Sequence, residues 1–293
     1  MITHPEKVLF PADGITKAEL AGYYEFIAPI MIPHIRNRPV TMERYHRGIG
    51  EAGFFQKDVS KGFPTWLKRV EVPKHGGTVH HPLVTDTRSL VWLANQNSIT
   101  PHVWSSRVPH LFQPDLCVFD LDPATDSEVE RVCAASLKLR DLLTELGLPG
   151  WVKTSGSKGF HIVVPLDKKS DFGTVFRFAN RVGKILVDRD PANLTQEFSK
   201  SDRGGRILVD TGRNGYSATF ACAYAVRART GAPVSAPCSW AEVESMKVGP
   251  RTFTLRNMPE RIAQVGDLWG NLLRKRRSLT RALLECGGLA PLC

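Results

Sequence analysis

The sequence lacks the features that mark membrane-embedded, exported and disulfide-linked proteins. Its apolar runs stay shorter than the ~18 to 20 residues of a membrane-spanning helix, and residues 1–10 lack the basic and then apolar pattern of a secretory signal. The six cysteines form no Cys-x-x-Cys pair, so neither a disulfide framework nor a cysteine zinc site is indicated. We therefore expect a protein of the cytoplasm with no membrane partner.

Two common nucleotide-binding motifs are missing as well. There is no Walker A sequence, and the Gly-x-Gly-x-x-Gly match at residues 48–53 runs into Phe-Phe-Gln-Lys instead of opening a helix, as a dinucleotide fingerprint must. The composition, with 42% apolar and 23% charged residues, suits a folded globular chain and excludes the signature of disorder. Neither a P-loop nor a Rossmann-type site is therefore expected.

The charge of the chain is positive overall but unevenly distributed. A formal net charge of +10 and a sequence pI near 9.5 reach the level at which a nucleic-acid partner is considered. Residues 111–147 nevertheless hold eight acidic against three basic residues, which leaves +15 for the rest of the chain. Clustered carboxylates in a basic protein suit a metal-dependent enzyme that acts on a polyanion, although a solvated acidic helix face explains most of this island.

The hydrophobic periodicity predicts a mixed α/β fold with an antiparallel component, and no linker or repeat marks a domain boundary. We expect helices at residues 16–32, 127–147 and 172–187, and strands at residues 115–122, 151–155, 160–164, 206–210 and 219–229. Thr16 is expected to cap the first helix and Pro33 to end it, while Ser127 and Glu130 form a capping box for the second.

Two carboxylates at the end of an expected strand are the strongest chemical signal. Asp120 and Asp122 are two residues apart, so they point to the same face and could ligate the same pair of divalent ions. Such pairs also occur at ordinary strand ends and in metal-dependent glycosyltransferases. Asp210 ends a second apolar strand and would complete a two-metal site, and the alternative for it is a salt bridge to Arg206 or Arg213.

Between these carboxylates lies a glycine-rich turn, Ser155-Gly-Ser-Lys-Gly-Phe-His161, which two expected strands flank. Its amides, hydroxyls, ammonium and imidazole could converge on a triphosphate, although the segment could also be a plain hairpin loop. The order of carboxylate pair, phosphate-type loop and third carboxylate, each at the end of a strand, favours the nucleotide site.

Taken together, these motifs resemble those of the archaeo-eukaryotic primase superfamily, specifically those of the polymerase domain of bacterial ATP-dependent DNA ligase D. The similarity covers nearly the whole chain and is carried by residues 4–11, 54–57, 119–123, 155–161, 210 and 219–229. It implies a core with an RNA-recognition-motif-like sheet packed on a second small sheet and helices. It also implies a single domain of residues 1–293, in which residues 1–110 contact the DNA end and template and residues 111–293 form the catalytic core.

The resemblance also assigns roles to individual residues. The metal ligands and catalytic carboxylates are Asp120, Asp122 and Asp210. The residues that contact the incoming nucleotide are Ser155, Lys158, His161, His102, Arg227 and Arg213. The residues that contact DNA are Lys7 and Lys17 at a 5′-phosphate, Phe54 and Phe55 at the template, and Arg203.

Some of these residues have an ordinary structural interpretation. The two lysines could be solvated, one phenylalanine of the pair could pack inward while the other is merely exposed, and His102 could be a hydrogen-bonded loop histidine.

The function that the resemblance implies is template-dependent extension of a primer 3′-hydroxyl, in gap filling and end joining during double-strand break repair. The cofactors would be two Mn²⁺ or Mg²⁺ ions and the substrates nucleoside triphosphates, with ribonucleotides preferred. The partners would be gapped or broken DNA with a 5′-phosphate, and Ku and a separate ATP-dependent ligase, in the bacterial nucleoid.

The sequence differs from a complete ligase D, and this difference limits the activities expected of this chain. The sequence has no Lys-x-Asp-Gly adenylation motif and no phosphoesterase-like histidine cluster, so we expect neither ligase nor end-trimming activity. A non-catalytic DNA-end-bridging module and a two-metal nuclease remain as alternatives, and the glycine-rich turn weighs against the nuclease.

Overall fold

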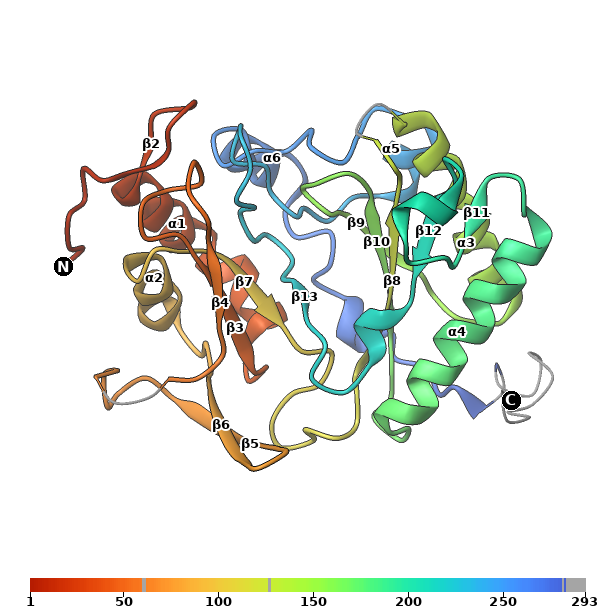
Figure 1. Cartoon of the computed structure of the whole chain (residues 1–293), viewed down its shortest axis with the longest axis horizontal. Coiled ribbons are helices and arrows are strands. Elements are labelled where there is room, and N and C mark those ends of the chain that lie inside the picture. The colour runs from red at the N-terminus through yellow and green to blue at the C-terminus, as the bar shows by residue number, and fades with distance from the viewer. Residues whose placement is uncertain (60–61, 126–127, 281, 283–293) are drawn as a thin grey trace. The chain divides into compact units, whose positions relative to one another are not determined.

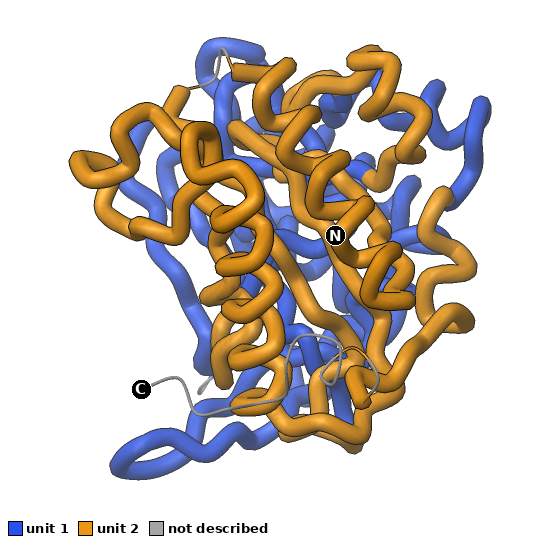
Figure 2. The backbone as a smooth tube through the Cα atoms, turned by 90° about the vertical axis from the view of Figure 1, so that its right-hand side faces the viewer, with its two compact units in different colours: residues 1–108, 219–236, 253–267 blue, residues 109–218, 237–252, 268–293 orange. Residues whose placement is uncertain are grey.

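The structure is a computed structural model that describes residues 1–59, 62–125, 128–280 and 282. The chain forms two compact units, each assembled from separate stretches of sequence (Figure 2). Unit 1 comprises residues 1–108, 219–236 and 253–267, and unit 2 comprises residues 109–218, 237–252 and the described part of 268–293. The chain thus leaves unit 1 after residue 108 and returns to it twice.

Unit 2 contains the five-stranded sheet that carries the predicted carboxylates (Figure 1). Its strands, in spatial order, are β11 (Leu194–Thr195), β12 (Ile207–Asp210), β8 (Leu116–Asp122), β10 (Phe160–Pro165) and β9 (Trp151–Thr154). The β11–β12 pair is parallel, and the other three pairs are antiparallel. The four longer strands match the predicted ones to within one residue, which confirms the antiparallel component.

Two helices cover one face of this sheet. Helices α3 (Val129–Glu145) and α4 (Phe172–Arg189) both contact β8 and each other, so they lie on the same side. With β8, β9, β10 and β12 they give the chain order strand, helix, strand, strand, helix, strand, which is a split βαβ arrangement. Both predicted helices are confirmed, whereas the predicted cap Ser127 lies outside the described residues. The remaining elements of unit 2 are α5 (Trp240–Glu244) and the 3-10 turns Lys200–Arg203, Gly212–Asn214 and Leu272–Arg274.

Unit 1 is built around a four-stranded antiparallel sheet. Its strands, in spatial order, are β13 (Phe220–Ala221), β7 (Ser98–Val103), β3 (Val40–Arg44) and β4 (Phe54–Gln56). The other elements are β1 (Val8–Phe10) paired with β2 (Ile15–Thr16), the hairpin of β5 (Arg69–Lys74) and β6 (Gly77–Pro82), and the helices α1 (Lys17–Ile35), α2 (Thr87–Asn95) and α6 (Met258–Val265). Among the described residues, no helix is both long and apolar enough to cross a membrane.

The first helix begins as predicted but ends later. Thr16 caps α1 and forms a capping box with Glu19. The prediction that Pro33 ends the helix is wrong, because α1 continues to Ile35. Proline lacks the N–H that would bond to the carbonyl four residues earlier. Burial of the last turn at Ile32 and Ile35 compensates for that lost bond.

The predicted strand at residues 219–229 is mostly absent. Only Phe220 and Ala221 pair as β13, and the chain then turns, with a hydrogen bond from the Ala225 amide to the Cys222 carbonyl. Tyr224 adopts a left-handed conformation with φ of 68°, which a strand does not allow. The apolar alternation therefore arises from a buried turn at Cys222, Tyr224 and Ala225, after which Val226 pairs with Val234 in an isolated antiparallel bridge.

Candidate active site

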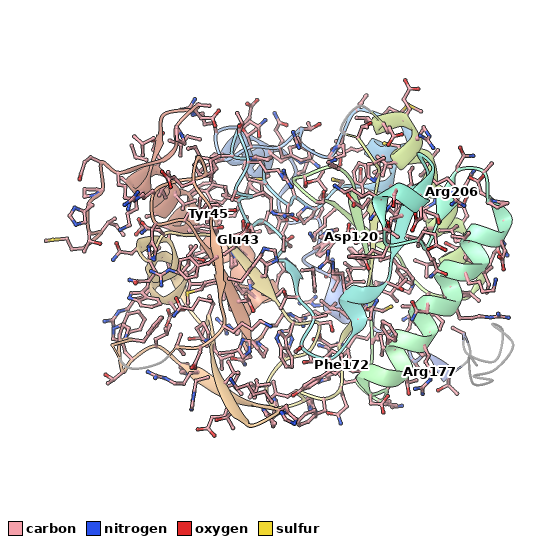
Figure 3. The ribbon with its side chains drawn as sticks, in the orientation of Figure 1. Glu43, Tyr45, Asp120, Phe172, Arg177 and Arg206 are labelled. Atoms are coloured by element: carbon pink, nitrogen blue, oxygen red, sulfur yellow. The ribbon has the colours of Figure 1, made fainter. Side chains whose placement is uncertain are left out.

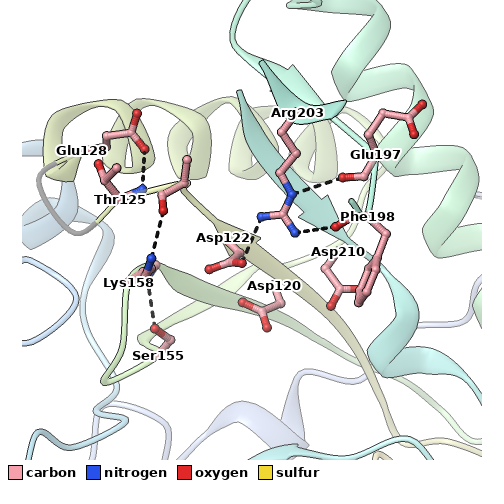
Figure 4. A network of polar contacts seen from close by, with 12 residues as sticks. Asp120, Asp122, Thr125, Glu128, Ser155, Lys158, Glu197, Phe198, Arg203 and Asp210 are labelled. Atoms are coloured by element: carbon pink, nitrogen blue, oxygen red, sulfur yellow. Dashed lines mark hydrogen bonds and ion pairs between the residues drawn. The ribbon is translucent and has the colours of Figure 1, made fainter. Parts of the chain in front are cut away.

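Three aspartates lie on two neighbouring strands of the unit 2 sheet, with Asp122 at the end of β8 and Asp210 at the end of β12. Asp120 and Asp122 alternate with the fully buried Phe119 and Leu121, so they share one face of β8. Asp210 on β12 lies directly opposite Asp120 in the antiparallel pair and therefore points to the same face. Figure 4 shows the three carboxylates grouped on this face of the sheet. The structure thus brings the predicted carboxylates together.

Two arginines neutralise these carboxylates. The Nε of Arg213 lies 3.5 Å from Asp120 and 3.4 Å from Asp210, so the predicted alternative partner of Asp210 is present beside the carboxylate cluster. Arg203 is almost fully buried and binds Asp122 at 3.2 Å. It also donates to the backbone carbonyl of Phe198 at 3.0 Å (Figure 4). The guanidinium predicted to contact DNA is thus engaged inside unit 2.

The environment drives the pKa values of the carboxylates apart. Burial raises the pKa of Asp120, but His161, Arg213 and Lys153 outweigh burial and hold that pKa below its usual range. Burial raises the pKa of Asp210, and the charge of Asp120 raises it further against the opposing effect of Arg213. Asp120 is therefore firmly ionised, while a second negative charge beside it is costly. A cation bound beside these carboxylates would relieve that cost.

The donor set fits hard divalent cations. Carboxylate oxygens are the ligands that Mg²⁺ and Mn²⁺ prefer. Across the described residues, no group of three His, Cys, Asp or Glu side chains is spaced to hold an ion. Arg213 lies between two of the carboxylates, and Arg203 binds the third. Binding of metal to Asp120, Asp122 and Asp210 would require both guanidinium groups to share these oxygens or withdraw.

The glycine-rich turn is held rigidly beside the end of β8. The Ser155 hydroxyl accepts hydrogen bonds from the amides of Ser157 and Gly159, both at 3.1 Å. A Cβ at residue 159 would lie 1.7 Å from the Leu121 carbonyl oxygen, so only glycine permits this close approach. The turn is therefore fixed next to the carboxylates, and the hydroxyl of Ser155 is part of what fixes it.

The lysine and the histidine of the turn have different partners. Lys158 donates from Nζ to the Ala124 carbonyl at 2.9 Å. His161 lies on β10 opposite Asp120, with Nε2 3.4 Å from a carboxylate oxygen. Its Nδ1 is 2.8 Å from the ammonium of Lys153, a fully buried residue that the sequence analysis missed.

The predicted DNA-binding lysines are neighbours in unit 1. Pairing of β1 with β2 places the Lys17 amide on the Lys7 carbonyl at 2.8 Å. Lys17 is 3% exposed and donates from Nζ to the Thr3 carbonyl at 2.7 Å, so it is not an ordinary solvated lysine. Burial and the charge of Lys7 lower the pKa of Lys17. Two positive charges held close together in this way favour the binding of a phosphate group.

The aromatic pair lies on the edge strand β4 of unit 1. Phe54 is 40% exposed and Phe55 is 61% exposed, so neither is a core residue. Arg44 lies over the Phe54 ring at 5.6 Å, and Phe55 meets the ring of His102 edge-on at 5.4 Å. Both rings are available for stacking, and the interpretation that one of them packs inward is wrong.

His102 lies on strand β7, not in a loop, and is anchored by a glutamate that the sequence analysis missed. Its Nε2 is 3.1 Å from Glu43, which also accepts a hydrogen bond from the Tyr45 hydroxyl at 2.9 Å (Figure 3). Burial raises the pKa of Glu43, but the hydrogen bonds from His102 and Tyr45 and the charges of His102 and Arg227 lower it to about 2. Arg227, the other nucleotide-binding candidate of unit 1, is thus electrostatically coupled to this cluster.

The predicted residues therefore form two sets, each within one unit. Unit 2 holds Asp120, Asp122, Ser155, Lys158, His161, Arg203, Asp210 and Arg213. Unit 1 holds Lys7, Lys17, Phe54, Phe55, His102 and Arg227.

Comparison with known proteins gives a consistent result. The family model described as "LigD, primase-polymerase domain" matches residues 16–269. The multifunctional non-homologous end joining protein LigD of Mycolicibacterium smegmatis is 35% identical over 269 residues, which cover 91% of this chain and 35% of that protein. The protein of the same name from Pseudomonas aeruginosa is 32% identical over 286 residues, covering 96% and 34%. The chain spans about a third of the length of these relatives.

A solved structure agrees with the sequence relatives. The polymerase domain of Mycobacterium tuberculosis ligase D, solved in complex with DNA, matches with a TM-score of 0.88 at 33% identity. The match covers 94% of this chain and 99% of the other. The expected mixed α/β fold of this type is thus confirmed. This chain belongs to the LigD primase-polymerase domain family, and as a polymerase domain it is a nucleotidyltransferase.

Proposed function

We propose that this chain extends a primer 3′-hydroxyl along a template strand, filling gaps and joining ends during repair of double-strand breaks. The observation that carries the proposal is the pairing of Asp120 with Asp210 on one face of the sheet, beside the rigid turn that begins at Ser155. Family membership supports the reaction type.

The proposed chemistry requires two divalent ions, Mn²⁺ or Mg²⁺, held by Asp120, Asp122 and Asp210. When bound, such ions lower the pKa of an attacking hydroxyl and neutralise charge on the phosphates. The carboxylates of this chain hold the ions, and Arg213 supplies a further positive charge at the same face. In this proposal Lys158 and the turn orient the triphosphate, and no side chain is needed as a nucleophile.

We propose that the residues of unit 1 contact DNA and nucleotide. The paired Lys7 and Lys17 offer charge to a 5′-phosphate, and the exposed Phe54 and Phe55 offer rings to template bases. His102, which Glu43 orients, and Ser155 of unit 2 are the candidates to read the sugar of the nucleotide. The DNA complex of the Mycobacterium tuberculosis domain supports a DNA substrate.

The finer architectural expectations belong to the same proposal. We infer that the split βαβ sheet of unit 2 is the RNA-recognition-motif-type catalytic sheet, and that residues 1–293 serve as one primase-polymerase domain. The names of the curated relatives support work in non-homologous end joining. Broken or gapped DNA with a 5′-phosphate, Ku and a separate ATP-dependent ligase are the proposed partners, in the bacterial nucleoid.

Primer extension on a short gapped duplex with Mn²⁺, with and without nucleotides, tests the function. Extension of the primer supports the polymerase. Shortening of the primer would select a two-metal nuclease, and binding without any change of length would select a DNA-end-bridging module. The variant Asp210→Asn, which keeps the shape of the side chain and removes its charge, is the matched control.

A further inference from the structure

A row of polar side chains crosses one face of the unit 2 sheet and ends at the carboxylate of Asp120. Lys153 on β9 pairs with His161 on β10, and His161 pairs with Asp120 on β8. Directly opposite residues in antiparallel strands project to the same side, so the three side chains follow one another across one face. The distances agree, with a hydrogen bond of 2.8 Å between Lys153 Nζ and His161 Nδ1, and a separation of 3.4 Å between His161 Nε2 and Asp120 Oδ1.

Lys153 acts through its neighbour because it is out of reach of any substrate. The residue is 0% exposed, and His161 beside it is 4% exposed. A buried ammonium is costly unless its partners compensate, so its place in the sheet calls for an explanation. Surface attraction of nucleic acid does not provide one, because the ammonium does not face solvent. The charge of Asp120 and the hydrogen bond to the imidazole do provide one.

The direction of the hydrogen bonds follows from the donor inventory. A lysine ammonium has donors and no acceptor, so Nδ1 of His161 must accept the bond with its lone pair. The proton of the neutral imidazole then resides on Nε2, the nitrogen that faces Asp120. The reverse tautomer would turn a lone pair toward the carboxylate and lose the bond to the ammonium.

We propose that Lys153 is a positioning residue that holds His161 as an Nε2–H donor directed at the carboxylate face of the sheet. This inference rests on the proposed polymerase function for its consequence but not for its geometry. A fixed Nε2–H keeps Asp120 in one rotamer, and it is also the group that a triphosphate oxygen at this face would meet. Lys153 thereby sets which nitrogen of His161 carries the proton.

The tautomer is measured directly on the metal-free protein by ¹⁵N–¹H correlation of the histidine rings, with His161→Gln to assign the signal. We expect one Nε2–H tautomer in the wild type, and its loss in Lys153→Met, which keeps the length of the chain and removes the donor. Lys153→Arg keeps a donor and should restore the signal in part. The exposed Lys184→Met on α4 is the matched control and should leave the signal unchanged.

Single-turnover extension at saturating nucleotide gives the second readout. Lys153→Met should slow extension at least tenfold while changing DNA affinity less than twofold, and Lys153→Arg should recover part of the rate. The proposal would be overturned by a wild-type ring that is protonated on Nδ1, or by a Lys153→Met variant that keeps the Nε2–H tautomer. The wild-type measurement tests the proposal even if Lys153→Met folds poorly. Absence of extension in the wild type would overturn the proposed function and leave the tautomer result standing.

Discussion

The carboxylate of Glu43 provides a quantitative test of the cluster that orients His102. Substitution by glutamine keeps the shape and an acceptor oxygen, and removes the charge that faces His102 and Arg227. The side chain is 15% exposed, so solvent screens these interactions little. The variant should therefore destabilise unit 1 through lost electrostatic interaction, without creating a cavity.

The expected magnitude follows from the pKa of Glu43, which the fold lowers from 4.5 to about 2. A group with a lowered folded-state pKa stabilises the protein above its unfolded pKa, and that stabilisation is lost as pH falls toward the folded value. At 1.36 kcal/mol per pH unit, the charge contributes about 3 kcal/mol at pH 7 and less than half of that at pH 3. The deficit of Glu43→Gln should shrink accordingly.

Urea unfolding of the wild type and Glu43→Gln at pH 7 and pH 3 measures this difference. Glu25→Gln, at an exposed position on α1, is the control and should stay within about 0.5 kcal/mol of the wild type at both pH values. A variant as stable as the wild type at pH 7 would refute the anchoring role of Glu43. A deficit that persists unchanged at pH 3 would show that packing, not charge, is responsible.

Three further predictions concern the proposed reaction. Extension should be abolished by replacing any one of the three aspartates with alanine, that is by Asp120→Ala, Asp122→Ala or Asp210→Ala. DNA binding in a gel-shift assay should be largely preserved, because basic surface supplies the affinity. Near-normal extension by Asp210→Ala would remove that residue from the metal site. Replacing Lys7 and Lys17 together should weaken binding to a gap with a 5′-phosphate by at least tenfold, since each charged hydrogen bond contributes about 1.5 to 3 kcal/mol. Equal weakening of binding to a gap with a 5′-hydroxyl would instead indicate general contact with the DNA backbone. Wild-type protein with Mn²⁺ should incorporate single ribonucleotides more efficiently than deoxyribonucleotides on one gapped template, and the opposite preference would show that this chain departs from its family.

The sequence was informative wherever a local rule decides the structure. The alternation around Asp120 and Asp122 located β8 and the shared face, and Thr16 located the start of α1, because period and capping depend on neighbours in the chain. Local rules failed where burial decides. Pro33 stays inside a helix whose last turn is packed, and the alternating segment that begins at residue 219 is a buried turn.

The candidate site shows the same division. The three aspartates and the turn at Ser155 were recognisable because their order along strand ends is visible in one dimension. Lys153 carried a usable signal, since a five-residue turn between two strands places it opposite His161 once the register is known. Glu43 carried none, because its contact with His102 spans 59 residues of sequence and depends on the pairing of β3 with β7.

The sequence by itself determined which chemical groups this protein possesses and which of them end strands. It could not determine their state, because protonation and hydrogen bonding depend on what burial removes from water and on which partners replace it. The tertiary structure alone decided that Arg203 is sequestered on Asp122 and that Lys17 is buried against Thr3. It also decided that the predicted residues divide between two units of the chain, since strand pairing between distant segments assigns each residue to its unit.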